Sequence, residues 1–81
     1  MKITYTVMRD YDDVATPFIT TEDFENAYDT AHEYVYGMGG VTYLVEKHDG
    51  KTVKVTKFEE GEPDWEGSEG LGFLVNVTEI K

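Results

Sequence analysis

Residues 19–40 of this chain are ITTEDFENAYDTAHEYVYGMGG, and they predict the one helix around which the fold is built. Thr20 can serve as the N-cap residue, and Ile19 can pack on Phe24 as a hydrophobic staple. The helix is therefore expected to begin at about Thr21. Its apolar positions follow the spacing of a buried stripe. The stripe consists of Phe24, Ala27, Tyr28, Ala31 and Val35. The candidates for a left-handed residue at its end are Gly37, Gly39 and Gly40.

Strand patterns lie on both sides of this helix. Alternating or β-prone residues predict strands over residues 2–8, 41–47, 52–58 and 71–80. The second and third of these are joined by residues 48–51, where Asp49-Gly50 favours a tight hairpin turn. Loops are expected over residues 10–17, which contain three Asp and Pro17, and over residues 59–70, which are acidic and contain glycines and Pro63.

The predicted fold class is α+β, with residues 1–81 forming one domain. The element order is β-α-β-β-β, so one helix packs on a four-stranded, mainly antiparallel sheet. A chain of 81 residues has room for a single core. The strand side chains expected to face the helix are Ile3, Tyr5, Val7, Val53, Val55, Phe73 and Val75.

The composition reduces the number of partner classes that fit the protein. Seventeen Asp and Glu against seven Lys and Arg give a formal charge of −10, which disfavours direct binding of nucleic acid or of an anionic membrane. No run approaches the roughly 20 apolar residues of a membrane span, so a cytoplasmic protein is expected. With no cysteine, the chain can form no disulfide, thiolate zinc site or cysteine nucleophile.

The chain offers little for catalysis. His32, His48 and Ser68 have no activating motif around them, so we expect no enzyme, no cofactor and no dedicated metal site. A weak cation site built from clustered carboxylates stays open as an alternative. The two clusters that could form it are Asp10, Asp12 and Asp13, and Glu62, Asp64 and Glu66.

Carboxylates gather on one side of the predicted helix. At about 100° per residue they fall in a narrow sector opposite the buried stripe, and no lysine or arginine lies between Thr20 and Gly40. They are Glu22, Glu25, Asp29 and Glu33, and Tyr36 lies on the same side as a candidate interface anchor. Two interpretations remain open: a solvated polar face, or an imitation of a phosphate backbone.

A second acidic cluster surrounds the only tryptophan. Its carboxylates are Glu59, Glu60, Glu62, Asp64, Glu66 and Glu69. Trp65 either folds back over the sheet edge or stands out as a recognition anchor. By contrast, four cations gather on the predicted hairpin, where they either protect a sheet edge from pairing or contact an acidic patch. They are Lys47, Lys51, Lys54 and Lys57.

These features predict a protein that acts by binding another protein. The leading hypothesis is that both acidic clusters, with Tyr36 and Trp65, enter a basic groove that normally receives DNA or RNA. Beginning Met1-Lys2-Ile3, this short acidic α+β chain resembles the small phage-encoded inhibitors of host enzymes, including anti-CRISPR and anti-restriction DNA mimics. The resemblance covers size, charge and architecture and rests on no motif, so it transfers no residue roles. It implies an inhibitor that works in the host cytoplasm.

Two alternatives to mimicry stay open. The first is a structural or regulatory interaction domain that binds through its open sheet face or edge, with weak salt dependence. The second is a module for a cation or small ligand. Either a monomer or a homodimer fits the sequence.

Overall fold

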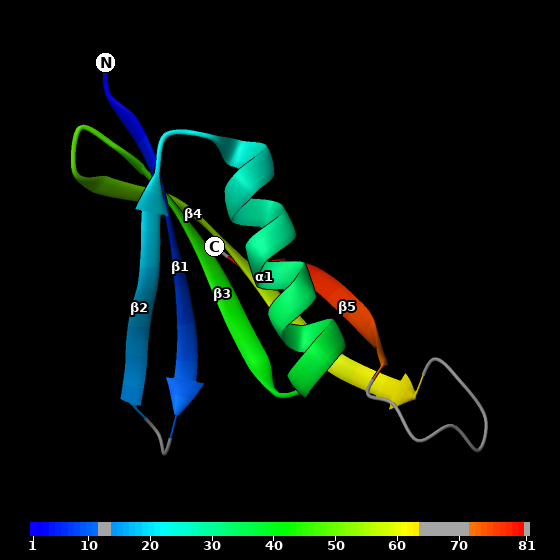
Figure 1. Cartoon of the computed structure of the whole chain (residues 1–81). Helices are drawn as coiled ribbons and strands as arrows, with labels where there is room; N and C mark the ends of the chain where they lie inside the picture. Colours follow the sequence, from blue (N-terminus) through cyan, green and yellow to red (C-terminus); the bar gives the residue numbers. More distant parts are fainter. Residues whose placement is uncertain (12–13, 64–71, 81) are drawn as a thin grey trace.

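The structure is a computed structural model that describes residues 1–11, 14–63 and 72–80. Its elements are β1 (Ile3–Tyr11), β2 (Val14–Thr21), α1 (Phe24–Met38), β3 (Val41–His48), β4 (Lys51–Pro63) and β5 (Phe73–Ile80). The strands form one sheet in the order β2-β1-β3-β4-β5, and all four pairings are antiparallel. The helix covers one face of this sheet (Figure 1). The α+β class and the antiparallel sheet are confirmed, whereas the four-stranded β-α-β-β-β order is wrong.

The additional strand is β2, which pairs with β1 where a loop over residues 10–17 was predicted. Pro17 lies inside β2, and the register shifts beside it between Val7 and Met8. A proline has no N–H to donate, so it is tolerated at a sheet edge or beside a bulge. β2 is an edge strand with such a shift, and proline therefore gave a misleading loop signal.

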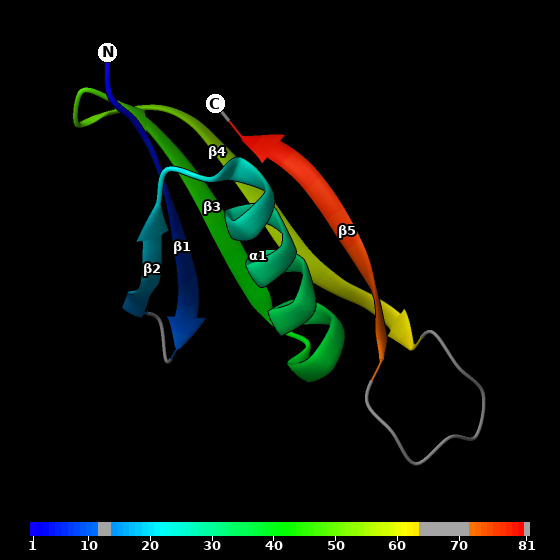
Figure 2. The same ribbon diagram turned by 45° about the horizontal axis from the view of Figure 1, so that its top comes forward.

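The pairing of β2 with β1 explains where the helix lies. β2 and β3 both run antiparallel to β1, so they run parallel to each other with β1 between them. Parallel strands need a long crossover connection, usually a helix. Helix α1 makes this connection and returns the chain to the opposite side of β1 (Figure 2).

The helix begins later than the sequence predicts. Asp23 is the N-cap, and its carboxylate accepts hydrogen bonds from the N–H groups of Glu25 and Asn26, at 3.0 and 3.4 Å. The predicted cap, Thr20, lies in β2 instead, where its hydroxyl is 3.1 Å from that of Thr6. Pairing of β2 with β1 therefore overrides the capping preference of Thr20, and with Asp23 as the N-cap Ile19 and Phe24 no longer occupy the two staple positions.

The C-terminal end of α1 is closed by Gly39 and by a buried arginine from β1. Gly39 has φ +71°, and its N–H donates to Val35 at 2.7 Å. Arg9 donates from Nη1 to the hydroxyl of Thr42 at 3.1 Å and from Nη2 to the carbonyl of Gly39. The guanidinium thus places a cation at the negative end of the helix dipole, from a strand rather than from the helix itself.

The β3–β4 hairpin is confirmed. Asp49 and Gly50 form its turn with φ +51° and +84°, the positive values that an Asp-Gly turn provides. The turn is attached to the start of β1, because Asp49 donates to the Lys2 carbonyl at 2.8 Å and accepts from the Lys2 N–H at 2.9 Å.

Beyond Glu59, β4 extends past the last pairing with β3 and continues along β5 as a two-stranded ribbon. The predicted loop over residues 59–70 is therefore wrong for residues 59–63, which belong to β4. Residues 64–70 lie outside the described part of the chain. The last strand is confirmed, although it begins at Phe73.

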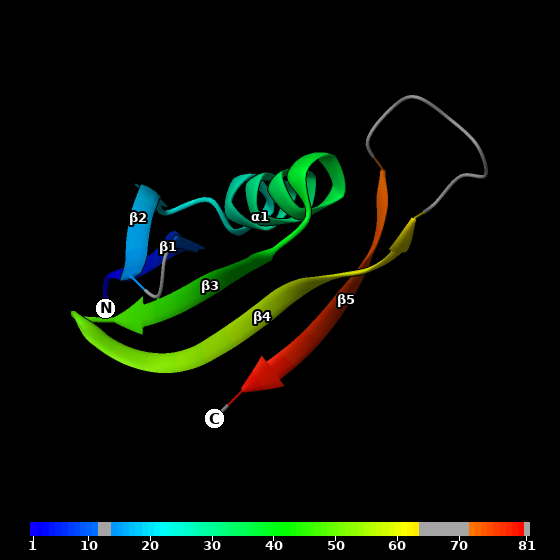
Figure 3. The ribbon, with the colours of Figure 1, turned by 90° about the horizontal axis from the view of Figure 1, so that it is seen from below.

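The core lies between α1 and the sheet (Figure 3). It is formed by Val7, Ala27, Ala31, Val35, Leu44 and Phe58. Tyr5, Ile19, Tyr28 and Val75 pack against it. Residues 54, 56 and 58 of β4 face the helix, so the prediction that Val53 and Val55 face inward is wrong. Val53 is 52% exposed at a register shift, and Val55 pairs with Val45 on the side away from α1. The sequence pattern misled because Lys54, a charged residue, occupies the helix side.

Candidate protein-binding surface

Three carboxylates form an exposed row along α1. Glu25, Asp29 and Glu33 are spaced four residues apart, so successive members rise about 6 Å along the helix axis. All three are exposed. Glu22 is also exposed, but it precedes the helix because Asp23 is the N-cap. The structure therefore keeps three of the four predicted members together as what we call the acidic row.

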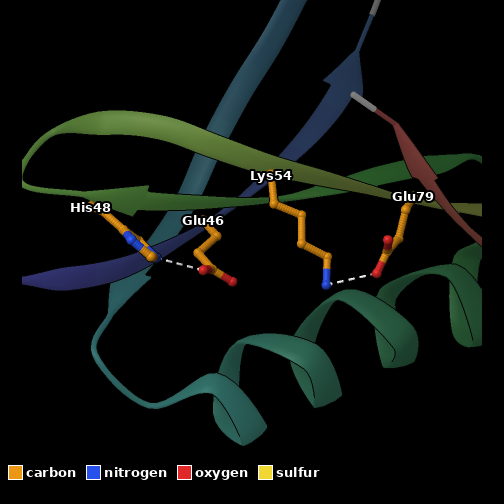
Figure 4. A network of polar contacts seen from close by, with 4 residues as sticks. All are labelled: Glu46, His48, Lys54 and Glu79. Carbon is orange, nitrogen blue, oxygen red and sulfur yellow. Dashed lines mark hydrogen bonds and ion pairs between the residues drawn. The ribbon is translucent and has the colours of Figure 1, made fainter.

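The acidic row differs from Glu46, Glu59 and Glu79 of the sheet, because no cationic side chain among the described residues pairs with it. Within the part of the chain that the structure describes, three ion pairs form, and none of them involves a residue of α1. Glu46 lies 2.6 Å from Nε2 of His48, and Glu79 lies 2.7 Å from Nζ of Lys54, both on the helix side of the sheet (Figure 4). The hydrogen bond and the charge of Glu79 raise the pKa of Lys54 above the usual lysine value.

A row of ring side chains runs beside the acidic row on α1. Its members, which we call the aromatic row, are Phe24, Tyr28, His32 and Tyr36. The centroids of successive rings are 5.8, 6.5 and 6.3 Å apart, and the last two pairs are nearly parallel, with interplanar angles of 18° and 15°. Tyr36, predicted as an exposed anchor, is 40% exposed and stacks on His32.

The two rows share one sequence pattern, which the prediction of a buried stripe missed. Each member of the acidic row directly follows a member of the aromatic row, so an aromatic–acidic pair recurs every four residues over 24–33. That spacing is close to one helical turn and aligns like with like. The sequence therefore contains this pattern, which becomes visible when the apolar and acidic positions are read as pairs.

The aromatic row ties the helix to the sheet. Phe24 meets Tyr5 of β1 edge-on at 5.4 Å, and Tyr28 meets Phe58 of β4 edge-on at 5.1 Å. Such contacts add about 0.5–1.5 kcal/mol each beyond burial. The carboxylates next to these rings are therefore presented from a helix whose orientation is fixed by packing.

The second predicted cluster is described only in part. Glu59, Glu60 and Glu62 lie in β4, with Glu60 and Glu62 exposed and Glu59 3.3 Å from Nζ of Lys57. The N–H of Glu60 donates to the Gly40 carbonyl at 3.0 Å, which joins the ribbon to the end of α1. The remaining predicted members lie outside the described residues. They are Asp64, Trp65, Glu66 and Glu69.

The lysines of the hairpin lie on strands that have a neighbour on each side in the sheet order. Among the described residues, β4 has no partner in β5 over residues 51–54, so Lys51 and Lys54 lie on a short open stretch of edge, and protection of that stretch stays a prediction. Lys54 and Lys57 pair with Glu79 and Glu59, which partly neutralises the sheet and leaves the acidic row as it is.

A hollow of about 370 Å³ lies on the flank of α1 and is lined by Thr30, Glu33, Tyr34 and Met38. Glu33 thus belongs to both the hollow and the acidic row. Met38 is half exposed, so the hollow offers a partner side chain an apolar contact beside a carboxylate.

Over residues 1–11, 14–63 and 72–80, no three His, Asp or Glu side chains come together as a metal site. Within the same residues, no helix has the length and apolar character needed to cross a membrane. No protein-family model, curated protein or solved structure matches the chain.

Proposed function

We propose that this protein acts by binding a basic surface of another protein through the outward face of α1. The observation that carries the proposal is the acidic row, whose three carboxylates are exposed and take part in none of the ion pairs formed by the described residues. Like charges four residues apart destabilise a helix, so the arrangement costs stability that a cationic partner would recover. The adjacent rings would supply stacking surfaces for arginine side chains of the partner.

The surface bound is proposed to be a cleft that normally receives nucleic acid. A DNA strand carries one charge about every 3.4 Å, whereas the acidic row carries one about every 6 Å. The row alone therefore reaches roughly half the charge density of one strand. Mimicry thus requires the carboxylates of the ribbon as well, beginning with Glu60, whose N–H donates to the Gly40 carbonyl just beyond α1, and continuing with Glu62. The protein would act as a competitive inhibitor in the cytoplasm, that of the host if a phage encodes it.

A non-mimic interaction domain is the second candidate. It is favoured by the apolar side chains that β5 exposes at the sheet edge, Leu74, Val77 and Ile80. Binding through this edge would depend on backbone hydrogen bonds and apolar contacts, and would therefore respond little to salt.

The test is to capture partners from a cell lysate on the intact protein and then to elute them with salt or with double-stranded DNA. We expect the captured partner to be a nucleic-acid-handling protein, and both salt and DNA should release it. A variant with Glu25→Gln, Asp29→Asn and Glu33→Gln should lose that partner. Capture of a protein that does not handle nucleic acid, or capture that survives these changes, would refute mimicry.

The matched control changes net charge by the same amount elsewhere. Thr20→Lys, Thr52→Lys and Val53→Lys add three positive charges at exposed positions outside α1. This control should still bind the partner. If both triple variants lose binding equally, net charge rather than the row is responsible.

A further inference from the structure

The outer strand β5 exposes an apolar edge. Among the described residues, β5 pairs only with β4 and ends the sheet (Figures 2 and 3). It contributes three of the eight large apolar side chains that the described part of the molecule exposes. They are Leu74 at 51%, Val77 at 42% and Ile80 at 39% exposed. An edge of this kind presents unpaired backbone groups together with apolar surface.

The two edges of the sheet are protected to different degrees. β2 contains Pro17 and a register shift, two of the devices that prevent a strand from pairing with another chain. Residues 73–78 of β5 are FLVNVT, with no charge, no proline and high β-propensity. The pairing of β4 with β5 is shifted only between Glu60 and Pro63, at the far end of the strand. Over residues 75–80, β5 is therefore a regular strand, and among the described residues no other strand and no proline or register shift protects its outer edge.

We infer that β5 pairs antiparallel with β5 of a second copy, about a two-fold axis at Val77. In this register Val77 lies directly opposite Val77 of the second copy. Val77 is on the helix side of the sheet, because it is in line across the strands with Phe58, Thr42 and Arg9. On the other side of the sheet, Leu74 of each copy faces Ile80 of the other. All three exposed apolar side chains of β5 are thus covered by one another.

The local charge is compatible with this pairing even though the molecule is acidic. Glu79 is the one charged residue within β5, and it is already paired with Lys54 at 2.7 Å. The net charge of −10 per chain still produces a general repulsion between copies. Because salt screens that repulsion and leaves apolar contacts intact, self-association should strengthen as salt is raised. The sheets become continuous, so both helices lie on the same face.

Single cysteines test the register, since the natural chain has none. Directly opposed antiparallel residues have Cα atoms about 4.5–5.5 Å apart, which is within disulfide range. Val77→Cys should therefore form a disulfide dimer under mild oxidation at least about tenfold faster than Val53→Cys, an exposed control outside β5. Asn76→Cys should be slow as well. Equal rates for Val77→Cys and Val53→Cys, or a faster reaction of Asn76→Cys, would overturn the proposed pairing.

Sedimentation of the unmodified chain gives a second, independent test. We expect a monomer–dimer equilibrium that shifts toward dimer with salt. Val77→Lys, which places two like charges face to face, should shift it to monomer, and Val53→Lys should not. At a chain concentration of about 1 mM, an association free energy of only about 4 kcal/mol would place half of the chains in dimers. A protein that remains monomeric at that concentration would therefore overturn the inference. Partner capture through the acidic row is unaffected by that outcome, so the two proposals fail separately.

Discussion

Replacing Arg9 with methionine tests whether a buried arginine from a strand holds the end of the helix. Arg9 is 6% exposed and donates to the Thr42 hydroxyl and the Gly39 carbonyl. Methionine keeps an unbranched apolar stem and removes the donors, which leaves both acceptors buried. Each unsatisfied buried group costs about 1–3 kcal/mol.

One effect opposes this loss, because methionine also removes the cost of burying a cation. We therefore expect Arg9→Met to lower the free energy of unfolding by about 2–4 kcal/mol. For a chain of this size that corresponds to a fall of roughly 10–25 °C in Tm. Urea titration gives the free energy, and hydrogen exchange should show faster opening at residues 38–40 than at the β3–β4 turn.

A double-mutant cycle with Thr42→Val identifies the mechanism. If an unsatisfied hydroxyl contributes to the loss, Thr42→Val should cost less in the Arg9→Met background than in the natural chain. Arg9→Lys keeps the charge but not the planar fork, so it should recover only part of the loss. A change below about 0.5 kcal/mol for Arg9→Met would show that desolvation cancels the hydrogen bonds, and would refute the reasoning.

Three further predictions concern α1 and the sheet. Asp23→Ala should destabilise the protein by about 1 kcal/mol in urea titrations because it removes the N-cap, whereas Asp23→Asn, which can still cap, should cost much less; equal losses would refute the capping role. Glu33→Gln should stabilise the folded protein by about 0.2–0.5 kcal/mol at low salt, and by less at high salt, because it removes the repulsion from Asp29. Glu25→Gln should give no gain, because Glu25 lies in the first turn near the positive end of the helix dipole. The folded-state pKa of Lys54 is raised, so while Glu79 is ionised the stabilisation by their pairing should be present below the unfolded lysine pKa and should be lost as pH rises through the folded lysine value. The difference in urea stability between the natural chain and Glu79→Gln should therefore shrink in strongly alkaline solution.

The elements that sequence predicted well are those defined by local chemistry. The β3–β4 turn needs positive φ at two adjacent residues, and Asp49-Gly50 is one of few pairs that accept it. The body of α1 follows from its apolar spacing. β2 was missed because its assignment depends on which strand lies beside it. Pro17 signals a loop in isolation and is compatible with a strand only at an edge, and strand order is not local information.

The same limit applies to the candidate site. The acidic row could be predicted because helical geometry alone aligns residues four apart. The start of the helix could not, since Thr20 and Asp23 are both good caps and only the pairing of β2 with β1 excludes Thr20. Arg9 was not predicted at all. Its role depends on β1 lying below the end of α1, a contact between residues 30 apart in the chain.

The distribution of cations bears on whether the acidity serves only solubility. Lys54 and Lys57 are placed where they neutralise Glu79 and Glu59, and Arg9 is used inside the fold. A lysine four residues from a glutamate would stabilise α1, yet residues 20–40 contain none. A requirement for solubility is satisfied by net charge anywhere on the surface, and does not explain an unneutralised row beside stacked rings. A salt titration separates the two surfaces that this arrangement leaves available, because binding through the acidic row should weaken with salt while pairing through β5 should strengthen. If both respond in the same direction, the acidic row and the β5 edge are not the independent surfaces that their chemistry indicates.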